Sequence, residues 1–413
     1  MSFEINPQKY YRLPWSLTDN GISWLEVTTK CNLACKGCYR DQDSGGHKTL
    51  DEISADLDVF AAVRRSDCIS IAGGDPLVHP RIVDIVATIR RRGWKPVLNT
   101  NGLALTPDLL HELKMAGVAG FTIHIDTSQK RPDNPSAVTE SDHNPLRQKY
   151  AEMLAREGGI ACSFNQTVKH DTLEDIPAVV RWATAHADIV HTMVFILYRE
   201  PNYFGDSAIY ANGREIDLGS VYDNSGWGGQ DVLEAADVAA RIQEADPHYE
   251  PCGYLNGTVD PGSTKWLLAM RVGTRDRTYG YASPRFMEFA QNANHLLRKR
   301  WLSYASPRTM AAGKMATLAF SLVDGGMRTV AGRFLASAFV NPSLFFKKAY
   351  LQGFMVIQPI DTMPDGQMNM CDGCPDMTVH DGKLYWSCRL EEIKKYGAFV
   401  SAVPRHLDPG RNP

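Results

Sequence analysis

Six short apolar runs, separated by five helix-like segments, constrain the fold of this chain more than any other feature. The apolar runs, which read as strands, are residues 22–29, 68–72, 96–99, 119–125, 160–168 and 189–197. The helix-like segments between them are residues 50–64, 80–92, 107–116, 147–157 and 173–186. Strands that alternate with helices pair in parallel through right-handed crossovers. The pattern therefore predicts an α/β fold with a partial (β/α)6 TIM-like barrel.

Three cysteines follow the first apolar run. Cys31, Cys35 and Cys38 have the spacing C-x3-C-x2-C. Thiolates are soft ligands, and a short loop that carries three of them can hold three irons of one cubane while the fourth iron stays open to a small chelating ligand. Zinc is the alternative, but the next few residues supply no further Cys or His, and His47 is the nearest candidate. The spacing therefore favours an iron–sulfur cluster.

Two turns with special backbone chemistry follow the second and third runs. Residues 73–76 read Gly-Gly-Asp-Pro, and residues 99–102 read Asn-Thr-Asn-Gly. Gly73 and Gly74 permit a backbone path that is closed to other residues and leaves carbonyls free to accept hydrogen bonds. Ordinary tight turns would look the same. Because reaction centres on such barrels lie where the strands end, we expect both turns and the cysteine loop to meet at one mouth.

Two later strands carry polar residues at alternate positions. His124 and Asp126 alternate at the end of one run, and Ser163 and Asn165 alternate along the next. Alternate residues of a strand share a face, so each pair is a candidate for the barrel interior and for contact with a cofactor or substrate. A satisfied structural role is the alternative for His124 and Asp126.

The cysteine motif and the two turns, in this order, resemble the radical S-adenosylmethionine (radical SAM) superfamily. The resemblance covers roughly residues 20–200 and implies the same partial barrel. In that family S-adenosylmethionine (SAM) chelates the open iron of a [4Fe-4S] cluster and is cleaved to a 5′-deoxyadenosyl radical that removes hydrogen from an unactivated C–H bond. The resemblance implies that Cys31, Cys35 and Cys38 are catalytic. The candidate cofactor-binding residues are Tyr39, Gly73, Gly74, Asp75, Asn99, Asn101, His124, Asp126, Ser163 and Asn165. The family often has an aromatic just before the third cysteine, whereas this chain has Gly37 there and Tyr39 just after it, so the group that covers the adenine of SAM stays open.

A second cysteine group lies near the C-terminal end. Cys371, Cys374 and Cys388 have x2 and x13 spacing. The spacing resembles the auxiliary-cluster domains of the twitch or SPASM kind, and this resemblance implies a second [4Fe-4S] cluster that relays an electron or binds substrate. Structural zinc is the alternative. Cys252, which lies in a turn, is the candidate fourth ligand, with His380 as a weaker rival.

The pattern changes beyond the sixth run, and it suggests four parts. We expect a leader at residues 1–20, the partial barrel at 21–200, a lid and mostly helical substrate-facing region at 201–360, and an auxiliary iron–sulfur domain at 361–413. Within the third part, residues 285–356 are both apolar and basic, but they contain no uninterrupted apolar run of the roughly 18 residues that a membrane span needs. We expect this region to pack on the open side of the barrel, with contact to a membrane surface as the less favoured alternative.

Composition limits the partners. A hydrophobic fraction of 44% is ordinary for a globular protein, and a net charge of −3 argues against nucleic acid as a general partner. Nine cysteines, six of them in two clusters, suit metal ligation in a reducing cytoplasm, and residues 1–9 do not read as a signal peptide. Cys68 and Cys162 lie in apolar runs, where buried structural thiols are the default.

The predicted function is that of a radical SAM enzyme, an oxidoreductase or transferase. Its expected substrate is a small-molecule or amphipathic biosynthetic intermediate, and its expected reductant is of the flavodoxin or ferredoxin type. Peptide modification and methyl or other group transfer are the alternatives. A non-catalytic iron–sulfur carrier is the least favoured hypothesis, because a carrier needs neither the Gly-Gly-Asp-Pro turn nor a barrel.

Overall fold

The computed structural model of the chain describes residues 3–38, 40, 45–198, 207–217 and 233–405. Tyr39 therefore lies outside the described residues, as does most of the expected lid at residues 201–231. Residues 207–217 of that segment form a hairpin of β8 (Ser207–Ala211) and β9 (Arg214–Ile216).

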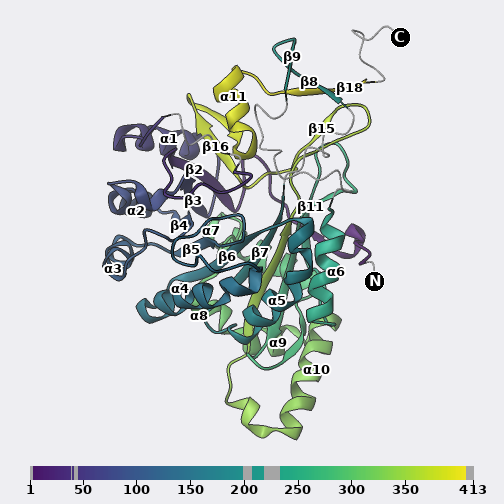
Figure 1. Cartoon of the computed structure of the whole chain (residues 1–413). Helices are drawn as coiled ribbons and strands as arrows, with labels where there is room; N and C mark the ends of the chain where they lie inside the picture. Colours follow the sequence, from purple (N-terminus) through teal and green to yellow (C-terminus); the bar gives the residue numbers. More distant parts are fainter. Residues whose placement is uncertain (1–2, 39, 41–44, 199–206, 218–232, 406–413) are drawn as a thin grey trace.

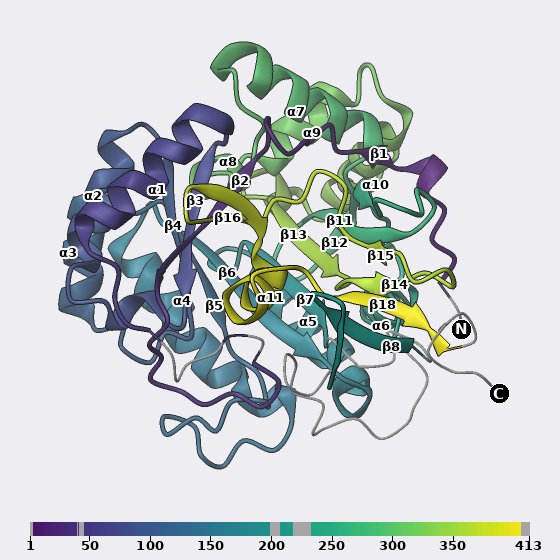
Figure 2. The same cartoon turned by 90° about the horizontal axis from the view of Figure 1, so that it is seen from above.

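Six parallel strands form the centre of the molecule, and they lie side by side in chain order. They are β2 (Ile22–Thr28), β3 (Cys68–Gly73), β4 (Lys95–Thr100), β5 (Gly120–His124), β6 (Ala161–Val168) and β7 (Thr192–Leu197). Each neighbouring pair is parallel. The connecting helices are α1 (Leu50–Val63), α2 (Ile82–Arg91), α3 (Pro107–Ala116), α4 (Asn144–Glu157) and α5 (Ile176–Ala185), and they line the outside of the sheet (Figure 1 and Figure 2). The mixed α/β fold with a parallel sheet is thus the one that the sequence pattern predicts.

Local signals explain where these helices begin and end. Thr49 caps α1 through a reciprocal capping box with Glu52, and Thr106 caps α3, which begins at Pro107. Gly117 ends α3 in the left-handed conformation, with φ of 98°.

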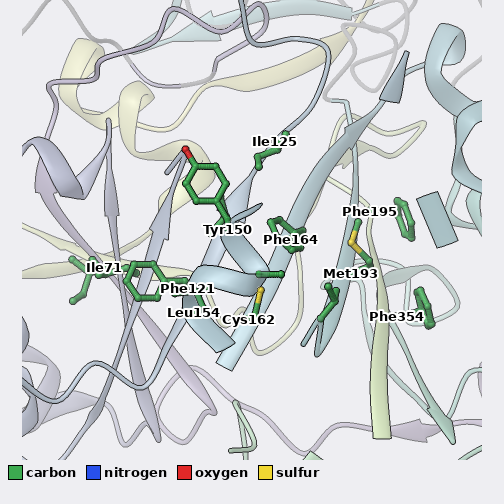
Figure 3. Packing of buried hydrophobic residues seen from close by; sticks show 14 of the residues in the cluster. Ile71, Phe121, Ile125, Tyr150, Leu154, Cys162, Phe164, Met193, Phe195 and Phe354 are labelled. Atoms are coloured by element: carbon green, nitrogen blue, oxygen red, sulfur yellow. The ribbon is translucent and has the colours of Figure 1, made fainter. Parts of the chain in front are cut away.

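The main hydrophobic core lies between the sheet and these helices (Figure 3). Phe121, Phe164 and Phe195 from three successive strands are fully buried there. Leu154 of α4 packs into the same cluster, and so does Cys162, whose expected role as a buried thiol fits this position. Each strand is buried on both faces, as parallel strands under helices are.

The sheet continues beyond the sixth strand, which differs from the expectation of a mostly helical region at 201–360. β13 (Tyr350–Ile357) pairs with β7 in parallel, and β11 (Thr264–Gly273) pairs antiparallel with β13. β10 (Gly253–Asn256) and β12 (Thr278–Tyr281) both pair with β11, and β1 (Tyr11–Arg12) pairs with β10. An apolar run of eight or ten residues does not by itself distinguish a buried strand from a helix, because only its partner decides.

The same region also contributes helices. They are α6 (Ala235–Ala245), α7 (Pro284–Arg298), α8 (Pro307–Met310), α9 (Gly313–Phe320), α10 (Gly325–Val340) and the 3₁₀ helix η7 (Pro342–Phe345). In Figure 1, α10 extends to the end of the molecule opposite α11 (Leu390–Tyr396). Within the ranges described above, no helix is both long enough and apolar enough to cross a membrane.

The C-terminal segment lies over one end of the sheet (Figure 1). It contains the short pair β14 (Asp361–Thr362) and β15 (Met368–Asn369), a hairpin of β16 (Met377–His380) and β17 (Lys383–Trp386), and then α11. Its last strand, β18 (Ser401–Pro404), pairs with β8. This arrangement brings the second cysteine group to the end of the barrel that carries the first.

Candidate functional site

Both cysteine groups border one cavity of about 480 Å³. Its wall includes Cys31, Cys35 and Cys38 from the loop after β2, and Cys371, Cys374 and Cys388 from the C-terminal segment. Residues from β3 to β7, β11 and β13 form much of the remaining wall. None of these six cysteines is in a disulfide. Two sets of three thiols therefore face a common interior.

The first cysteine loop is held by the loops that follow β4 and β5. The Lys36 amide donates to the Ser128 carbonyl at 3.0 Å, and Cys35 forms an isolated backbone bridge with Gln129. Asn101 Nδ2 donates to Asn32 Oδ1 at 2.7 Å and lies 3.7 Å from Cys31 Sγ. These contacts order the cysteine loop.

Burial affects the thiols of this loop. It raises the pKa of Cys31, and it raises the pKa of Cys35 to about 12, with the neighbouring Cys38 as the next cause. The protonated thiol is therefore favoured at neutral pH, and a metal must displace these protons to bind the thiolates.

Gly37, where relatives of the expected family often have an aromatic, has a steric reason to be glycine. Its φ is +79°, and a Cβ at this position would lie 2.3 Å from the Tyr198 ring. Tyr198 comes directly after β7 and lines the cavity, so an aromatic side chain from another element occupies this space.

The Gly73-Gly74 turn passes directly against the end of β2. A Cβ on Gly73, whose φ is +136°, would lie 2.0 Å from the Thr28 carbonyl oxygen. A Cβ on Gly74 would lie 2.2 Å from the carbonyl oxygen of Lys30. Both glycines line the cavity, and the absence of Cβ atoms lets this turn pack directly against the chain that leads into the cysteine loop.

Asp75 has a structural role in place of the predicted contact with a cofactor. It is fully buried and is absent from the cavity wall. Its carboxylate accepts hydrogen bonds from Thr100 Oγ1 at 2.8 Å, from the Asn101 amide at 2.7 Å and from the Leu77 amide at 2.9 Å. Asp75 thus joins the turn after β3 to the turn after β4, and Asn99 and Asn101 of the second turn line the cavity.

His124 and Asp126 form a pair, but only the histidine borders the cavity. His124 Nε2 lies 2.6 Å from Asp126 Oδ2 and 3.1 Å from Thr167 Oγ1. Burial alone would raise the pKa of Asp126, but His124 and the hydrogen bonds from Ser128 and Thr167 hold that pKa well below its ordinary value. Asp126 is thus an ionised anchor for the loop that braces Cys35, rather than an exposed cofactor contact.

Ser163 and Asn165 face the cavity from β6. Ser163 Oγ and Asn165 Oδ1 are buried and have no hydrogen-bond partner within the described part of the chain. Buried polar atoms are nearly always paired in folded proteins, so these two are suited to a polar ligand.

The second cysteine group lies against the chain at the C-terminal end of β10. Cys371 forms a backbone bridge with Gly257, and the Asp372 amide donates to the Asn256 carbonyl at 2.8 Å. The Cys371 and Cys374 thiols are hydrogen-bonded to each other. In the described ranges, no three His, Cys, Asp or Glu side chains converge on a position for one metal ion.

Cys252 is absent from the cavity wall that carries the other three cysteines, which corrects the expectation that it is the fourth ligand. It is fully buried in an apolar cluster with Leu13 and Leu255, and burial raises its pKa to about 12. Cys371 packs against the same cluster. Its bridge partner Gly257 lies five residues beyond Cys252, roughly 16 Å away at about 3.3 Å per residue of extended strand.

The two candidate histidines also lie elsewhere. His380 pairs with Lys383 at the end of the β16–β17 hairpin, and His47 Nδ1 contacts Thr28 Oγ1 at 2.9 Å. Neither residue lines the cavity.

Sequence reasoning missed much of the cavity wall. Asp376 lies in the wall near the second cysteine group, and burial raises its pKa to about 6. The cavity wall also includes large, mostly apolar side chains: Trp266, Met270, Met287, Leu302, Tyr304 and Met310. These residues belong to several separate elements, so no local motif could have identified them.

Comparison with known proteins shows what the region of the parallel sheet is similar to. Residues 25–183 match the model of the Radical SAM superfamily. This part of the chain is therefore similar to radical SAM domains, and the similar proteins are named as synthases and cyclases.

Two of the similar proteins have different named activities. AdoMet-dependent heme synthase from Nitratidesulfovibrio vulgaris is 28% identical over 168 residues, which are 39% of this chain and 43% of that protein. GTP 3′,8-cyclase 1 from Mycobacterium tuberculosis is 29% identical over 184 residues, which are 41% of this chain and 50% of that protein. The chain thus spans half or less of the length of these relatives. The crystal structure of Streptococcus suis SuiB bound to precursor peptide SuiA superposes with a TM-score of 0.36 at 15% identity, over 45% of this chain and 40% of that chain.

Proposed function

We propose that this protein is a radical SAM enzyme that removes a hydrogen atom from an unactivated C–H bond of an amphipathic biosynthetic intermediate. The observation that carries the proposal is the single cavity bordered by both sets of three cysteines. The radical SAM domain and the second group of thiols both border this cavity. A substrate held in the cavity would therefore lie within reach of both.

The residues present fit a [4Fe-4S] cluster and SAM. Cys31, Cys35 and Cys38 supply three thiols from one loop, which is the donor set of a cubane with one open iron. Gly73 and Gly74 line the same cavity beside that loop, in a turn that packs directly against the Thr28 and Lys30 carbonyls. The unpaired polar atoms of Ser163 and Asn165 offer hydrogen bonds within the same cavity. When bound, the cluster and SAM supply the one-electron chemistry that generates the hydrogen-abstracting radical.

The residues of the chain itself bind and orient the substrate and keep water out of the cavity. Trp24 and Trp266 line the cavity from β2 and β11, and large buried rings keep water from a reactive species. His124, held by Asp126 and Thr167, presents a fixed polar edge to the same space. These residues position the substrate, while the cofactors supply the radical chemistry.

We assign a second iron–sulfur cluster to Cys371, Cys374 and Cys388. Because Cys252 lies in the apolar core, these three thiols are the protein ligands that we propose. A cluster with three protein ligands leaves an iron for the substrate to bind, and this favours direct substrate binding over simple electron relay. The proposed electron donor is a flavodoxin or ferredoxin, and a reducing cytoplasm suits both clusters.

The amphipathic substrate class is supported by the mixed lining of the cavity. The wall carries polar groups such as Asn99, Asn101 and Asn165. It also carries apolar side chains such as Met287, Leu302 and Met310. A molecule with both polar and apolar parts would match this lining.

The test is anaerobic reconstitution followed by metal analysis and turnover of SAM. Wild-type protein should contain about eight irons, as expected for two cubanes, and should release 5′-deoxyadenosine slowly with dithionite. The triple variant of Cys31, Cys35 and Cys38 to alanine should hold about half the iron and release none. Cys371→Ala should also hold about half the iron but should still cleave SAM. Cys252→Ala is the matched control and should keep about eight irons.

Two results would contradict the proposal. Release of 5′-deoxyadenosine by the triple variant would exclude the first cysteine group as the site of SAM cleavage. One zinc in place of half the iron in the wild type would replace the second cluster with a structural zinc.

A further inference from the structure

The end of the molecule formed by α9, α10 and η7 exposes an unusual set of apolar side chains. Phe339, Val340 and Phe346 are 88%, 84% and 92% exposed. Met315, Leu335 and Phe345 are also exposed, at 67%, 46% and 49%. We call these six residues the apolar tip. α9 and η7 both pack beside α10, and large exposed apolar patches mark interaction sites on folded proteins.

The folding of α10 does not require these residues to be apolar. The inner face of α10 carries Val330, Phe334 and Ala338, which are buried against β11 to β13 and their neighbours. Leu335 and Phe339 lie one turn apart on the outer face. A surface helix is normally polar on its outer face, whereas the C-terminal half of α10 is apolar on both its inner and its outer face.

The tip is ordered by internal contacts. Lys314 at the start of α9 donates to the Phe345 carbonyl at 2.6 Å and to the Lys347 carbonyl at 3.1 Å. The rings of Phe334 and Phe345 meet edge to face, with centroids 5.9 Å apart. These contacts fix η7 beside α10, so the exposed rings project from a rigid base.

Charge around the tip is strongly positive. Residues 313–348 contain five Lys and Arg residues and a single acidic residue, Asp324. Asp324 is buried and caps α10 by accepting from the Met327 amide at 2.6 Å. An exposed acid, Asp276, lies near Lys347 at 3.9 Å. Residues 284–348 together hold ten Lys and Arg and two acidic residues, whereas the whole chain has a net charge of −3.

We propose that the apolar tip docks this protein on a bilayer that contains anionic phospholipids. Exposed Phe and Val side chains flanked by lysines are the chemistry of interfacial binding, in which rings enter the acyl boundary and cations remain at the headgroups. A protein partner fits less well, because lysine is depleted at protein–protein interfaces. The position of α10 at one end of the molecule leaves the rest of the chain clear of the lipid (Figure 1).

The helix that carries the tip also packs with a residue of the cavity wall. Met310 lines the cavity and lies in the same buried cluster as Phe334 and Ala338 of α10. This cluster therefore connects the cavity wall to α10. Docking on a membrane does not depend on the proposed catalytic function and is tested without turnover.

The experiment is flotation of the full-length, reconstituted protein with vesicles of phosphatidylcholine alone or of phosphatidylcholine mixed with phosphatidylglycerol. Wild type should float with the mixed vesicles, and high salt should weaken the binding. The variant Phe339→Ser/Phe346→Ser should lower the bound fraction by about tenfold. Lys347→Glu/Lys348→Glu should remove the preference for phosphatidylglycerol.

The matched control is Met115→Ser/Val138→Ser, which changes residues that are 75% and 81% exposed and lie outside the tip. This variant should bind as wild type does, and equal thermal unfolding of all variants would show that they are folded. Failure of wild type to bind either vesicle, or equal binding by the Phe339/Phe346 variant, would overturn the proposal. So would a dimer in sedimentation that the Phe339/Phe346 variant disperses without any vesicle binding, since the tip would then contact a second copy of the chain.

Discussion

At the scale of single residues, the site depends on glycines at positions where any side chain would collide with a neighbouring element. Gly73 and Gly74 are confined by carbonyl oxygens of the β2 end, which a Cβ would meet at 2.0 and 2.2 Å. Gly37 is confined in the same way by Tyr198. In each case glycine allows a second element to approach the cysteine loop closely, and the close approach shapes the cavity.

Gly74→Ala should therefore displace the end of β2 and the cysteine loop. We expect a loss of SAM binding and a fall in stability of about 1–3 kcal/mol, because a neighbouring backbone must move. Equilibrium dialysis with SAM and urea unfolding measure the two effects. Gly332→Ala is the control: it lies within α10 with nothing within 4 Å of an added Cβ, and it should raise stability by about 0.5–1 kcal/mol. Unchanged SAM binding in Gly74→Ala would contradict the role of this turn.

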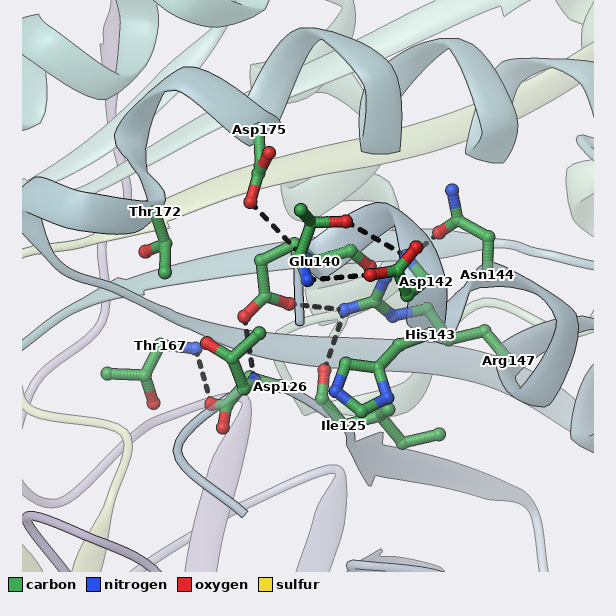
Figure 4. A network of polar contacts seen from close by, with 12 residues as sticks. Ile125, Asp126, Glu140, Asp142, His143, Asn144, Arg147, Thr167, Thr172 and Asp175 are labelled. Carbon is green, nitrogen blue, oxygen red and sulfur yellow. Dashed lines mark hydrogen bonds and ion pairs between the residues drawn. The ribbon is translucent and has the colours of Figure 1, made fainter. Parts of the chain in front are cut away.

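At the scale of elements, a buried ionic network holds the loop between β5 and α4 (Figure 4). Arg147 of α4 pairs with Glu140 at 2.8 Å, and both side chains are fully buried. Arg147 also donates to the Ile125 carbonyl at 2.8 Å, directly before Asp126. Burial lowers the pKa of Arg147 and raises that of Glu140, so each depends on the other to remain charged. This network fixes the loop whose Ser128 and Gln129 hold the first cysteine loop.

Arg147→Met should destabilise the protein by about 3–5 kcal/mol, because it leaves the Glu140 carboxylate buried without its partner. The double variant Glu140→Leu/Arg147→Met should recover most of that loss, because it removes both charges. Urea unfolding of the apo protein measures both changes. Arg156→Met, at an exposed position of the same helix, should change stability by less than about 0.5 kcal/mol. Equal losses for the single and the double variant would show that the ion pair is not the cause.

At the scale of the whole molecule, Arg64 joins three segments that are far apart in the sequence. Its guanidinium is buried and donates to the Ile22 carbonyl at 2.9 Å and to the Cys374 carbonyl at 2.8 Å. A third contact, to the Leu17 carbonyl, is made at the start of the chain. The two cysteine groups share a cavity partly because this side chain ties the second group to the barrel.

Arg64→Leu should loosen the C-terminal segment and cost about 3 kcal/mol, since it leaves several buried carbonyls without a donor. Limited proteolysis should then cut between residues 371 and 388 more rapidly than in wild type. Arg65→Leu is the neighbouring control: its side chain is 54% exposed and its ion pair with Asp19 spans 3.5 Å, so stability should change by less than about 0.5 kcal/mol. Equal rates of cleavage in the two variants would contradict the role of Arg64.

Residue order alone was enough to predict the six central strands and both cysteine groups. These features are local: each strand is a short apolar run, and each group lies within one loop or segment, so residue order alone reveals it. The polar residues of β6 were predictable in the same way, because alternation along a strand decides which face Ser163 and Asn165 share.

Other features depend on partners that are distant in the sequence, and they became visible only in the folded chain. The runs at β11 and β13 became strands because β7 offered an edge for pairing. Cys252 lies in a turn by sequence, yet β10 places it in an apolar cluster. Asp75 belongs to a ligand-like motif, yet the turn after β4 occupies its carboxylate. Burial and hydrogen bonding are set by which elements meet in space, and a residue's neighbours in the sequence do not contain that information.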